Sequence, residues 1–165
     1  MPLTYLKLAQ YDVSASAGVT NIEFTNISQS FDDLELKLSL RTTVADSEGK
    51  VTFNGTTTGY TIRRIWGNGA SIGSDALYGY LMTNRSDYTA STFSNAFVYI
   101  PNYASSNNKT FFTDGVAETN GTNNTMVLST SLWSNTAAIT SIKLEPLSGN
   151  FALNSTATLY GIKRT

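Results

Sequence analysis

The sequence of 165 residues contains no cysteine and no histidine. Without cysteine, disulfides and thiolate metal sites are excluded, and without histidine the usual zinc and copper ligand sets are excluded as well. The same two absences rule out Ser-His-Asp and Cys-His catalytic arrangements. Carboxylate chemistry remains, but none of the twelve acidic residues stands out as a catalytic pair, because nearly all lie in expected turns or on polar faces. We therefore predict that the protein is not an enzyme and uses no cofactor.

Two acidic clusters illustrate this interpretation. Asp32-Asp33 precedes an expected strand, where it favours a turn and solubility. Asp46 and Glu48 offer carboxylates at positions i and i+2, but the further ligands and the closing glutamate of an EF-hand are missing. We interpret the second cluster as a solvated loop and expect no metal site.

Charge is scarce as well. Charged residues make up 14% of the chain, against the usual ~25%, and 11 basic and 12 acidic residues leave a net charge of −1. No basic field is available to neutralise phosphates, so nucleic acid is not an expected partner. No apolar run approaches the ~20 residues of a membrane-spanning helix, and the N-terminus MPLTYLKLAQ lacks the pattern of an export signal. We expect no membrane partner, and release from a host by lysis.

What the chain has in quantity is alternation of apolar and polar residues, interrupted by turn residues about every ten positions. The clearest run is LELKLSLRT, which places Leu34, Leu36, Leu38 and Leu40 on one face and polar residues on the other. One dry face and one wet face are typical of antiparallel sheets. Asn54-Gly55 is a tight-turn signal because both residues tolerate positive φ.

These patterns predict an all-β protein, a two-sheet antiparallel sandwich of nine to eleven strands with a jelly-roll-like arrangement. The length and the lack of repeats or linkers predict a single domain over residues 1–165, with residues 1–10 as an N-terminal arm or edge strand. Residues 67–92 are the least regular part, where we expect a long loop or a short edge strand.

Aromatic residues form the remaining constellation, with two tryptophans and nine tyrosines. Aromatic side chains in a sandwich serve the core or its rim, a protein interface, or a platform on which sugar rings stack. The candidate ligand platform consists of Tyr78, Tyr80 and Tyr88 in the irregular region. The candidate protein interface consists of Pro2, Leu3, Tyr5, Leu6, Arg63, Arg64 and Trp66. For the two arginines, pairing with carboxylates of a neighbouring subunit and simple exposure beside a core tryptophan remain alternatives.

Several segments resemble those of small β-rich proteins of tailed phages, cyanophages among them. The segments are VTFNG, RRIWGNGAS, AFVYIPNYASSNNKT and LWSNTAAITSIKLEPLSGNFALNSTATLYGIKRT, and the resemblance covers most of residues 33–163. It is most specific in Ile100-Pro-Asn-Tyr103 and in residues 138–162. The chain departs from the pattern after Asn54-Gly55, where TTT stands in place of an expected aspartate.

The resemblance implies a virion structural protein with a jelly-roll-like fold. Among virion roles, a capsid decoration or cement protein fits a chain of this length without a coiled-coil stalk or fibre repeat. Its partners would be the major capsid protein or other virion proteins, and it would form a homo-oligomer, either a dimer or a trimer. One alternative is a tail or fibre module that binds a host receptor or glycan. Another is a free carbohydrate-binding domain.

Overall fold

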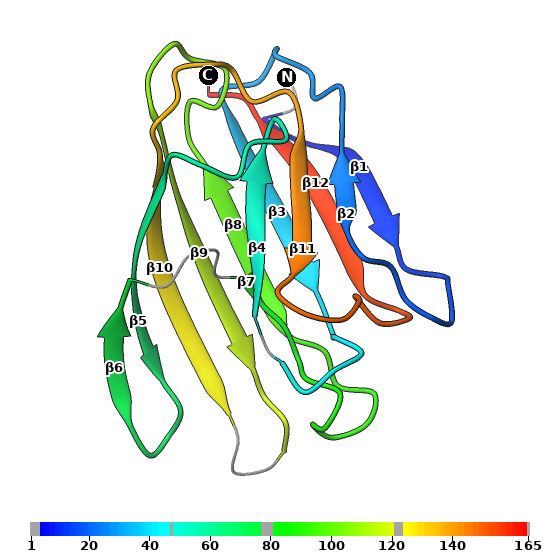
Figure 1. Ribbon diagram of the computed structural model, residues 1–165. Helices are drawn as coiled ribbons and strands as arrows, with labels where there is room; N and C mark the ends of the chain where they lie inside the picture. The colour runs from blue at the N-terminus through cyan, green and yellow to red at the C-terminus, as the bar shows by residue number, and fades with distance from the viewer. Residues whose placement is uncertain (1–3, 47, 77–80, 121–123, 165) are drawn as a thin grey trace.

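A computed structural model describes residues 4–46, 48–76, 81–120 and 124–164 of the chain, and over these residues all regular structure is β. The strands form one sheet of eight and one of four, packed face to face (Figure 1). In chain order they are β1 (Tyr5–Asp12), β2 (Ile22–Phe24), β3 (Asp33–Ser39), β4 (Glu48–Phe53), β5 (Tyr60–Gly67), β6 (Ile72–Asp75), β7 (Leu81–Met82), β8 (Asn95–Ile100), β9 (Lys109–Ala117), β10 (Thr125–Trp133), β11 (Ile142–Pro146) and β12 (Thr156–Ile162).

The antiparallel pairings are nested. β1 pairs with β12, β2 with β11, β3 with β8 and β4 with β7. Successive pairs alternate between the sheets, so that the larger sheet begins β1-β12-β3-β8 and the smaller one runs β2-β11-β4-β7. The chain therefore crosses from one sheet to the other at each of its first connections, and the two sheets enclose one core.

The main core is built from the inward faces that alternation predicts. Leu34, Leu36, Leu38 and Leu40 are all buried, while Lys37 between them is exposed. An aromatic group centred on Phe53 fills the space between the sheets near one end of the molecule. Its ring lies 5.0 Å from that of Phe111 and 5.5 Å from that of Trp133 between ring centres, edge to face in both cases.

Two hairpins inserted into the nested order widen the larger sheet. β5–β6 lies in sequence between β4 and β7, and β9–β10 lies between β8 and β11. Together they add the strands β9-β10-β5-β6 beyond β8. Figure 1 shows the smaller sheet in front of β12, β3 and β8, with β10, β5 and β6 extending past it. The inner face of this extension has a small core of its own, formed by Ile62, Met82, Ala117 and Val127, against which Trp66 and Tyr88 pack.

The two-sheet antiparallel sandwich is confirmed, and so are the faces assigned to the clearest runs. Asn54 and Gly55 have φ values of 51° and 68°, as their tight turn requires. The described residues form twelve strands rather than nine to eleven. The excess comes from the irregular region, because β7 has two residues and β6 has four, which is too short to show an alternating pattern.

Substitution of Phe53 by alanine tests the position of the core. Phe53 is fully buried, so its loss leaves a cavity and removes the edge-to-face contacts with Phe111 and Trp133. We expect the free energy of unfolding to fall by about 3–5 kcal/mol in urea denaturation. The matched control is Leu128→Ala at an exposed strand position, which should change it by less than about 0.5 kcal/mol. Similar losses from the two variants would show that the core lies elsewhere.

Candidate functional site

Exposed apolar side chains gather at the two edges of the larger sheet. Nine large apolar residues are exposed among the described ones. Three of them, Tyr5, Leu6 and Tyr11, lie on the edge strand β1. Four lie at the opposite edge, on β5, β6 and β10, and these are Ile65, Ile72, Met126 and Leu128. Clustering of this kind is typical of contact surfaces, whereas single exposed apolar residues are not informative.

We call the second group the outer patch, because its residues lie on the face of the larger sheet that points away from the smaller sheet. In β10 the odd positions Val127 and Ser129 are buried, so Met126 and Leu128 point outward. Register extends the patch across the strands, since Leu128 pairs with Ile65, which in turn pairs with Ser74. Ile72, 91% exposed, stands beside it on the free edge strand.

The outer patch is hollowed rather than flat. Two adjoining depressions of about 670 and 720 Å³ lie over β5, β6 and β10. Both are lined by Ile65, Ser74 and Leu128, and the first also reaches Phe112 on β9. Open, largely apolar hollows on a sheet face can receive side chains of another protein.

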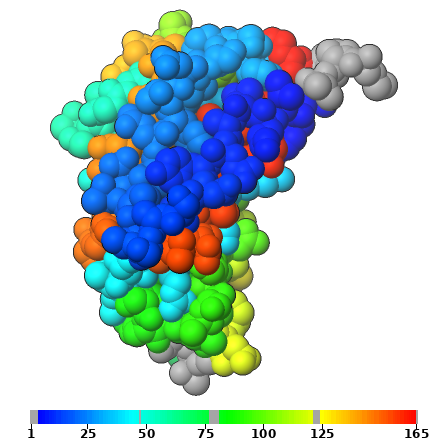
Figure 2. All heavy atoms as spheres, turned by 90° about the vertical axis from the view of Figure 1, so that its right-hand side faces the viewer, coloured from blue at the N-terminus to red at the C-terminus, as the bar shows by residue number. Residues whose placement is uncertain are grey.

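The second surface, the β1 edge, is a long free strand edge. β1 pairs with β12 on one side, and within the described part of the chain no strand pairs with its other side. Figure 2, which views this side of the molecule, shows β1 at the surface next to β12. A groove of about 340 Å³ separates β1 from the segment 23–28. Unpaired backbone groups along such an edge are a template for a strand of another chain.

The structure places the predicted interface residues in different settings. Tyr5 and Leu6 are exposed on β1, and Tyr5 stacks on Tyr160 with 4.6 Å between ring centres. Pro2 and Leu3 lie outside the described residues. Arg63 is exposed on the outer face of β5, where its Nη1 donates to the carbonyl of Ile62 at 2.9 Å.

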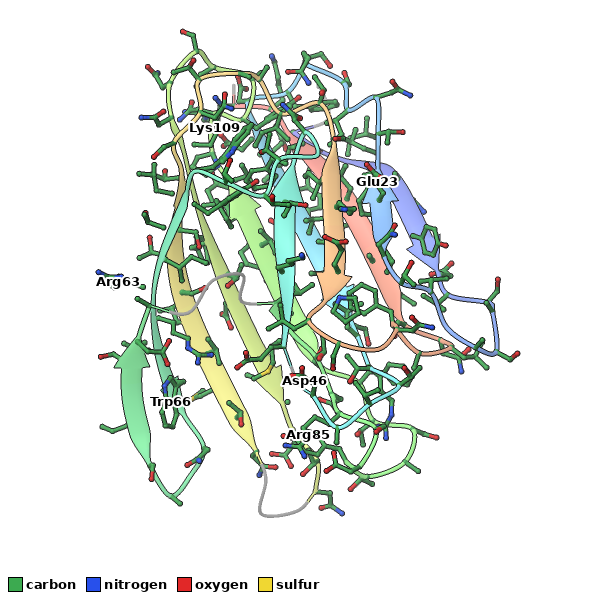
Figure 3. All side chains as sticks on the ribbon, in the orientation of Figure 1. Glu23, Asp46, Arg63, Trp66, Arg85 and Lys109 are labelled. Atoms are coloured by element: carbon green, nitrogen blue, oxygen red, sulfur yellow. The ribbon has the colours of Figure 1, made fainter. Side chains whose placement is uncertain are left out.

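Arg64 and Trp66 point inward instead. Arg64 donates from Nε to Asp75 at 2.5 Å and from Nη1 to Glu48 at 3.3 Å. Trp66 donates from Nε1 to the other oxygen of Asp75 at 3.2 Å. The carboxylates with which Arg64 pairs belong to its own chain rather than to a neighbouring subunit, and they lock β5 to β6 and β4. Figure 3 shows Arg63 and Trp66 on the β5 side of the molecule and Glu23 on the β2 side.

The candidate ligand platform is only partly described. Tyr78 and Tyr80 lie outside the described residues. Tyr88 is half-buried, packs against the small core under the extension, and lies below the guanidinium of Arg85, which is 5.3 Å from the ring centre. The nearby ion pair with Arg85 lowers the pKa of Asp87.

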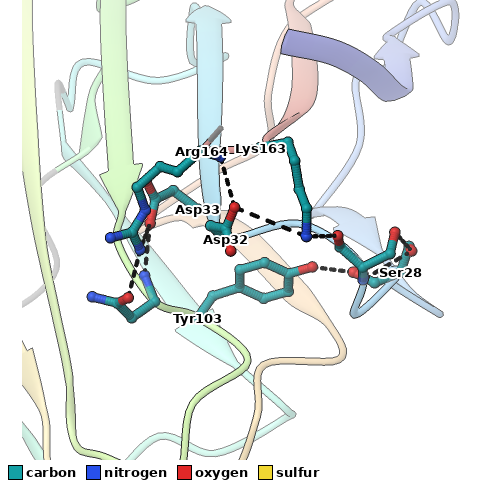
Figure 4. A network of polar contacts seen from close by, with 8 residues as sticks. Ser28, Asp32, Asp33, Tyr103, Lys163 and Arg164 are labelled. Atoms are coloured by element: carbon teal, nitrogen blue, oxygen red, sulfur yellow. Dashed lines mark hydrogen bonds and ion pairs between the residues drawn. The ribbon is translucent and has the colours of Figure 1, made fainter. Parts of the chain in front are cut away.

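A network of polar contacts ties three segments together at one end of the larger sheet (Figure 4). Asp33, nearly buried, accepts from the Tyr99 hydroxyl at 2.8 Å, the Asn102 backbone N–H at 2.9 Å and the Arg164 guanidinium at 3.0 Å. Burial, and after it the hydrogen bond to Asp33, raises the pKa of Tyr99. The Tyr103 hydroxyl donates to the carbonyl of Ser28. The network fixes the segment after β12, so we assign it a structural role.

Buried Lys109 has a similar role in a neighbouring turn. Its Nζ donates to the carbonyls of Ser105 at 2.8 Å, Asn107 at 2.5 Å and Thr136 at 3.5 Å. Burial lowers the pKa of this ammonium group. The three carbonyls come from the two loops that flank the β9–β10 hairpin, so the lysine joins them.

Within the described ranges, no three acidic side chains come together in a way that could hold a metal ion. The described residues contain no helix long and apolar enough to cross a membrane. Comparison with known protein families, with curated proteins and with solved structures finds no match to this chain.

The outer patch was not predicted from the sequence. Its signal is present in Met126-Val127-Leu128, where both faces of a strand are apolar, and in Ile65 on the outward side of a strand with Ile62 inward. An apolar residue on the solvent-facing side of a strand is the only signal of such a patch in the sequence. The residues around Ile72 do not alternate over the length of a strand. Its exposure could therefore be predicted only by knowing that β6 is an edge strand.

Asp33→Asn tests the structural role of the polar network. The amide keeps the size of the side chain but replaces one acceptor oxygen by a donor that faces the N–H and O–H groups of the network. We expect the free energy of unfolding to fall by about 2–3 kcal/mol in chemical denaturation. Asp114→Asn, an exposed carboxyl on the outer face of β9 and outside the network, is the matched control and should cost less than about 0.5 kcal/mol. Equal losses would contradict the role given to Asp33.

The Tyr99 hydroxyl gives a second test through pH. Because the pKa of Tyr99 is raised on folding above the 10.0 of the unfolded chain, its neutral form is favoured in the native state. Its contribution to stability is therefore complete below pH 10 and is lost as the pH rises through the native pKa. We expect the difference in denaturation midpoint between the wild type and Tyr99→Phe to narrow above about pH 10. A constant difference across this range would show that the hydroxyl does not stabilise the fold.

Proposed function

We propose that this protein is a virion structural protein of a tailed phage that decorates the capsid and stabilises the lattice of the major capsid protein through protein contacts. The observation that carries the proposal is the placement of exposed apolar side chains at two opposite edges of one sheet. A rigid module with two separate contact surfaces can bridge two neighbours. Modest contacts suffice on a fixed lattice, because many copies act together.

The nested strand order supports the same proposal. A sheet that begins β1-β12-β3-β8, facing one ordered β2-β11-β4-β7, has the interleaving of a jelly roll. That is the fold implied by the resemblance of segments such as IPNYASSNNKT to phage proteins. In this interpretation β9-β10-β5-β6 is an addition to the jelly roll, and it carries the outer patch.

Attachment to the shell is assigned to the β1 edge. β1 offers eight residues of edge, with Leu6 at 39% exposure and Tyr11 at 36%, and Tyr11 lines the groove toward segment 23–28. A strand from a capsid protein can add to this edge through backbone hydrogen bonds while the groove takes its side chains. By mass action, a protein that binds only the assembled shell stabilises that shell.

Counting copies tests the role in the virion. In gradient-purified particles from a lysate in which this chain is made, we expect quantitative mass spectrometry to find it at hundreds of copies per particle, in fixed proportion to the major capsid protein. Its absence from particles would contradict a virion role. A few to a few dozen copies would contradict decoration and favour a tail module.

A variant tests the surface that attaches. Leu6→Asp combined with Tyr11→Asp places two charges beside the edge without removing a core residue, and it should lower the occupancy of undecorated shells by about tenfold or more. Leu147→Asp places a charge at an exposed apolar position outside β1 and its groove, so it is the matched control and should bind like the wild type. Unchanged binding of the double variant would show that the β1 edge is not the attachment surface.

A further inference from the structure

The face of the sheet that carries the outer patch also carries two opposite charges that form no ion pair with the described residues. On the outward faces of β9, β10, β5 and β6, the only charged residues are Arg63 and Asp114. Both are exposed, and neither has an ion-pair partner within the described ranges. Most other charges of the chain, such as Arg64 with Asp75, are paired internally. Two unpaired opposite charges on an apolar face therefore require an explanation.

Register fixes where the two charges stand. Arg63 on β5 is opposite Thr130 on β10, which is opposite Phe112 on β9. Ile65 is opposite Leu128, which is opposite Asp114. The two charges therefore occupy opposite corners of a rectangle three strands wide and two rows high, and Ile65 and Phe112 occupy the other corners. Standard sheet spacings place the charged corners about 12 Å apart between Cα atoms, with Leu128 and Thr130 between them.

This arrangement is complementary to itself. A two-fold axis that lies in the interface, passes through the centre of the rectangle and is perpendicular to the diagonal from Arg63 to Asp114 exchanges the two charged corners. Arg63 of each copy then faces Asp114 of the other, and each apolar corner lies close to its own counterpart. The strands of the two copies cross steeply, as in orthogonal sheet packing. In such an isologous contact every interaction occurs twice, which gives two ion pairs around an apolar centre.

We propose that the outer patch is a self-association surface, on which a second copy of this chain docks face to face through reciprocal Arg63–Asp114 ion pairs around Ile65, Leu128 and Phe112. The chemistry favours a second copy over an unrelated partner, because one face supplies both charges at positions that a two-fold axis interchanges. The inference concerns the isolated chain and does not depend on a role in a virion. The hollows over β5, β6 and β10 provide room for the partner's side chains.

The size of the patch predicts a weak dimer. Four strands spaced by about 4.8 Å, over some six residues of their length, give a face roughly 15–20 Å on a side. Two such faces bury roughly 600–800 Å² in total, which is below the ~1,200 Å² of the smallest stable complexes, so the dissociation constant should be on the order of 100 µM. Such a dimer forms at high local concentration, as when many copies are held close together.

Charge exchange tests the proposal directly. Sedimentation equilibrium of the purified full chain up to about 1 mM should show a monomer–dimer equilibrium in the wild type. Arg63→Asp and Asp114→Arg should each weaken the dimer about 100-fold, because each creates two repulsive contacts worth about tenfold apiece. The double variant Arg63→Asp/Asp114→Arg restores both ion pairs with reversed polarity and should recover the wild-type dissociation constant to within about tenfold.

Controls keep each outcome interpretable. Glu23→Lys reverses an exposed strand charge outside the patch and should dimerise like the wild type. Ile65→Asp, at a 60% exposed position, should abolish the dimer without unfolding the chain, and circular dichroism checks the fold of every variant. A wild type that stays monomeric up to about 1 mM overturns the proposal. So does a double variant as weak as the single ones, an outcome that would assign the patch to a different protein.

Discussion

The structure depends on one constraint, which is that a sheet of four strands has to cover the inner face of a sheet of eight. Where the two sheets overlap, alternating leucines and the aromatic group around Phe53 form a continuous apolar core. Beyond the overlap, β6 and parts of β10 and β5 extend past the smaller sheet. There the inner face is closed by Met82 and Tyr88 and by Arg64, whose charge is matched by Glu48 and Asp75. The extension is thus held by specific side chains, and its outer face remains free for contacts.

Much of this fold could be predicted from the sequence, because alternation reports directly on burial. LELKLSLRT predicted the orientation of β3, and Asn54-Gly55 predicted the turn that follows β4, since both signals are local. The partners of Arg64 could not be predicted, because Glu48 lies on β4 in the smaller sheet and approaches β5 only in the folded molecule. The outer patch was missed for the same reason: Ile65, Leu128 and Asp114 become neighbours only through the register of three strands.

The distribution of charge separates structural from interacting surfaces. A chain with so few charged residues uses most of them in pairs, and the Asp33 network joins segments that are far apart in sequence. Arg63 and Asp114 differ from these, because their side chains lie on the outward face of the larger sheet, where their opposite charges are available to another molecule. The β1 edge differs again, since it offers backbone groups together with apolar side chains. Two surfaces of different chemistry at opposite edges can engage two partners at once, which is what the bridging of a lattice requires.

The most direct measurement of whether the molecule acts through these two surfaces is an electron cryomicroscopy reconstruction of the virus particle in which this chain is located. We expect the chain on the outside of the capsid, with the β1 edge against the shell and the outer patch against a second copy. A map in which both the β1 edge and the outer patch face solvent, with the chain held by its loops, would contradict the proposed role of the two edges, and so would a particle that lacks the chain.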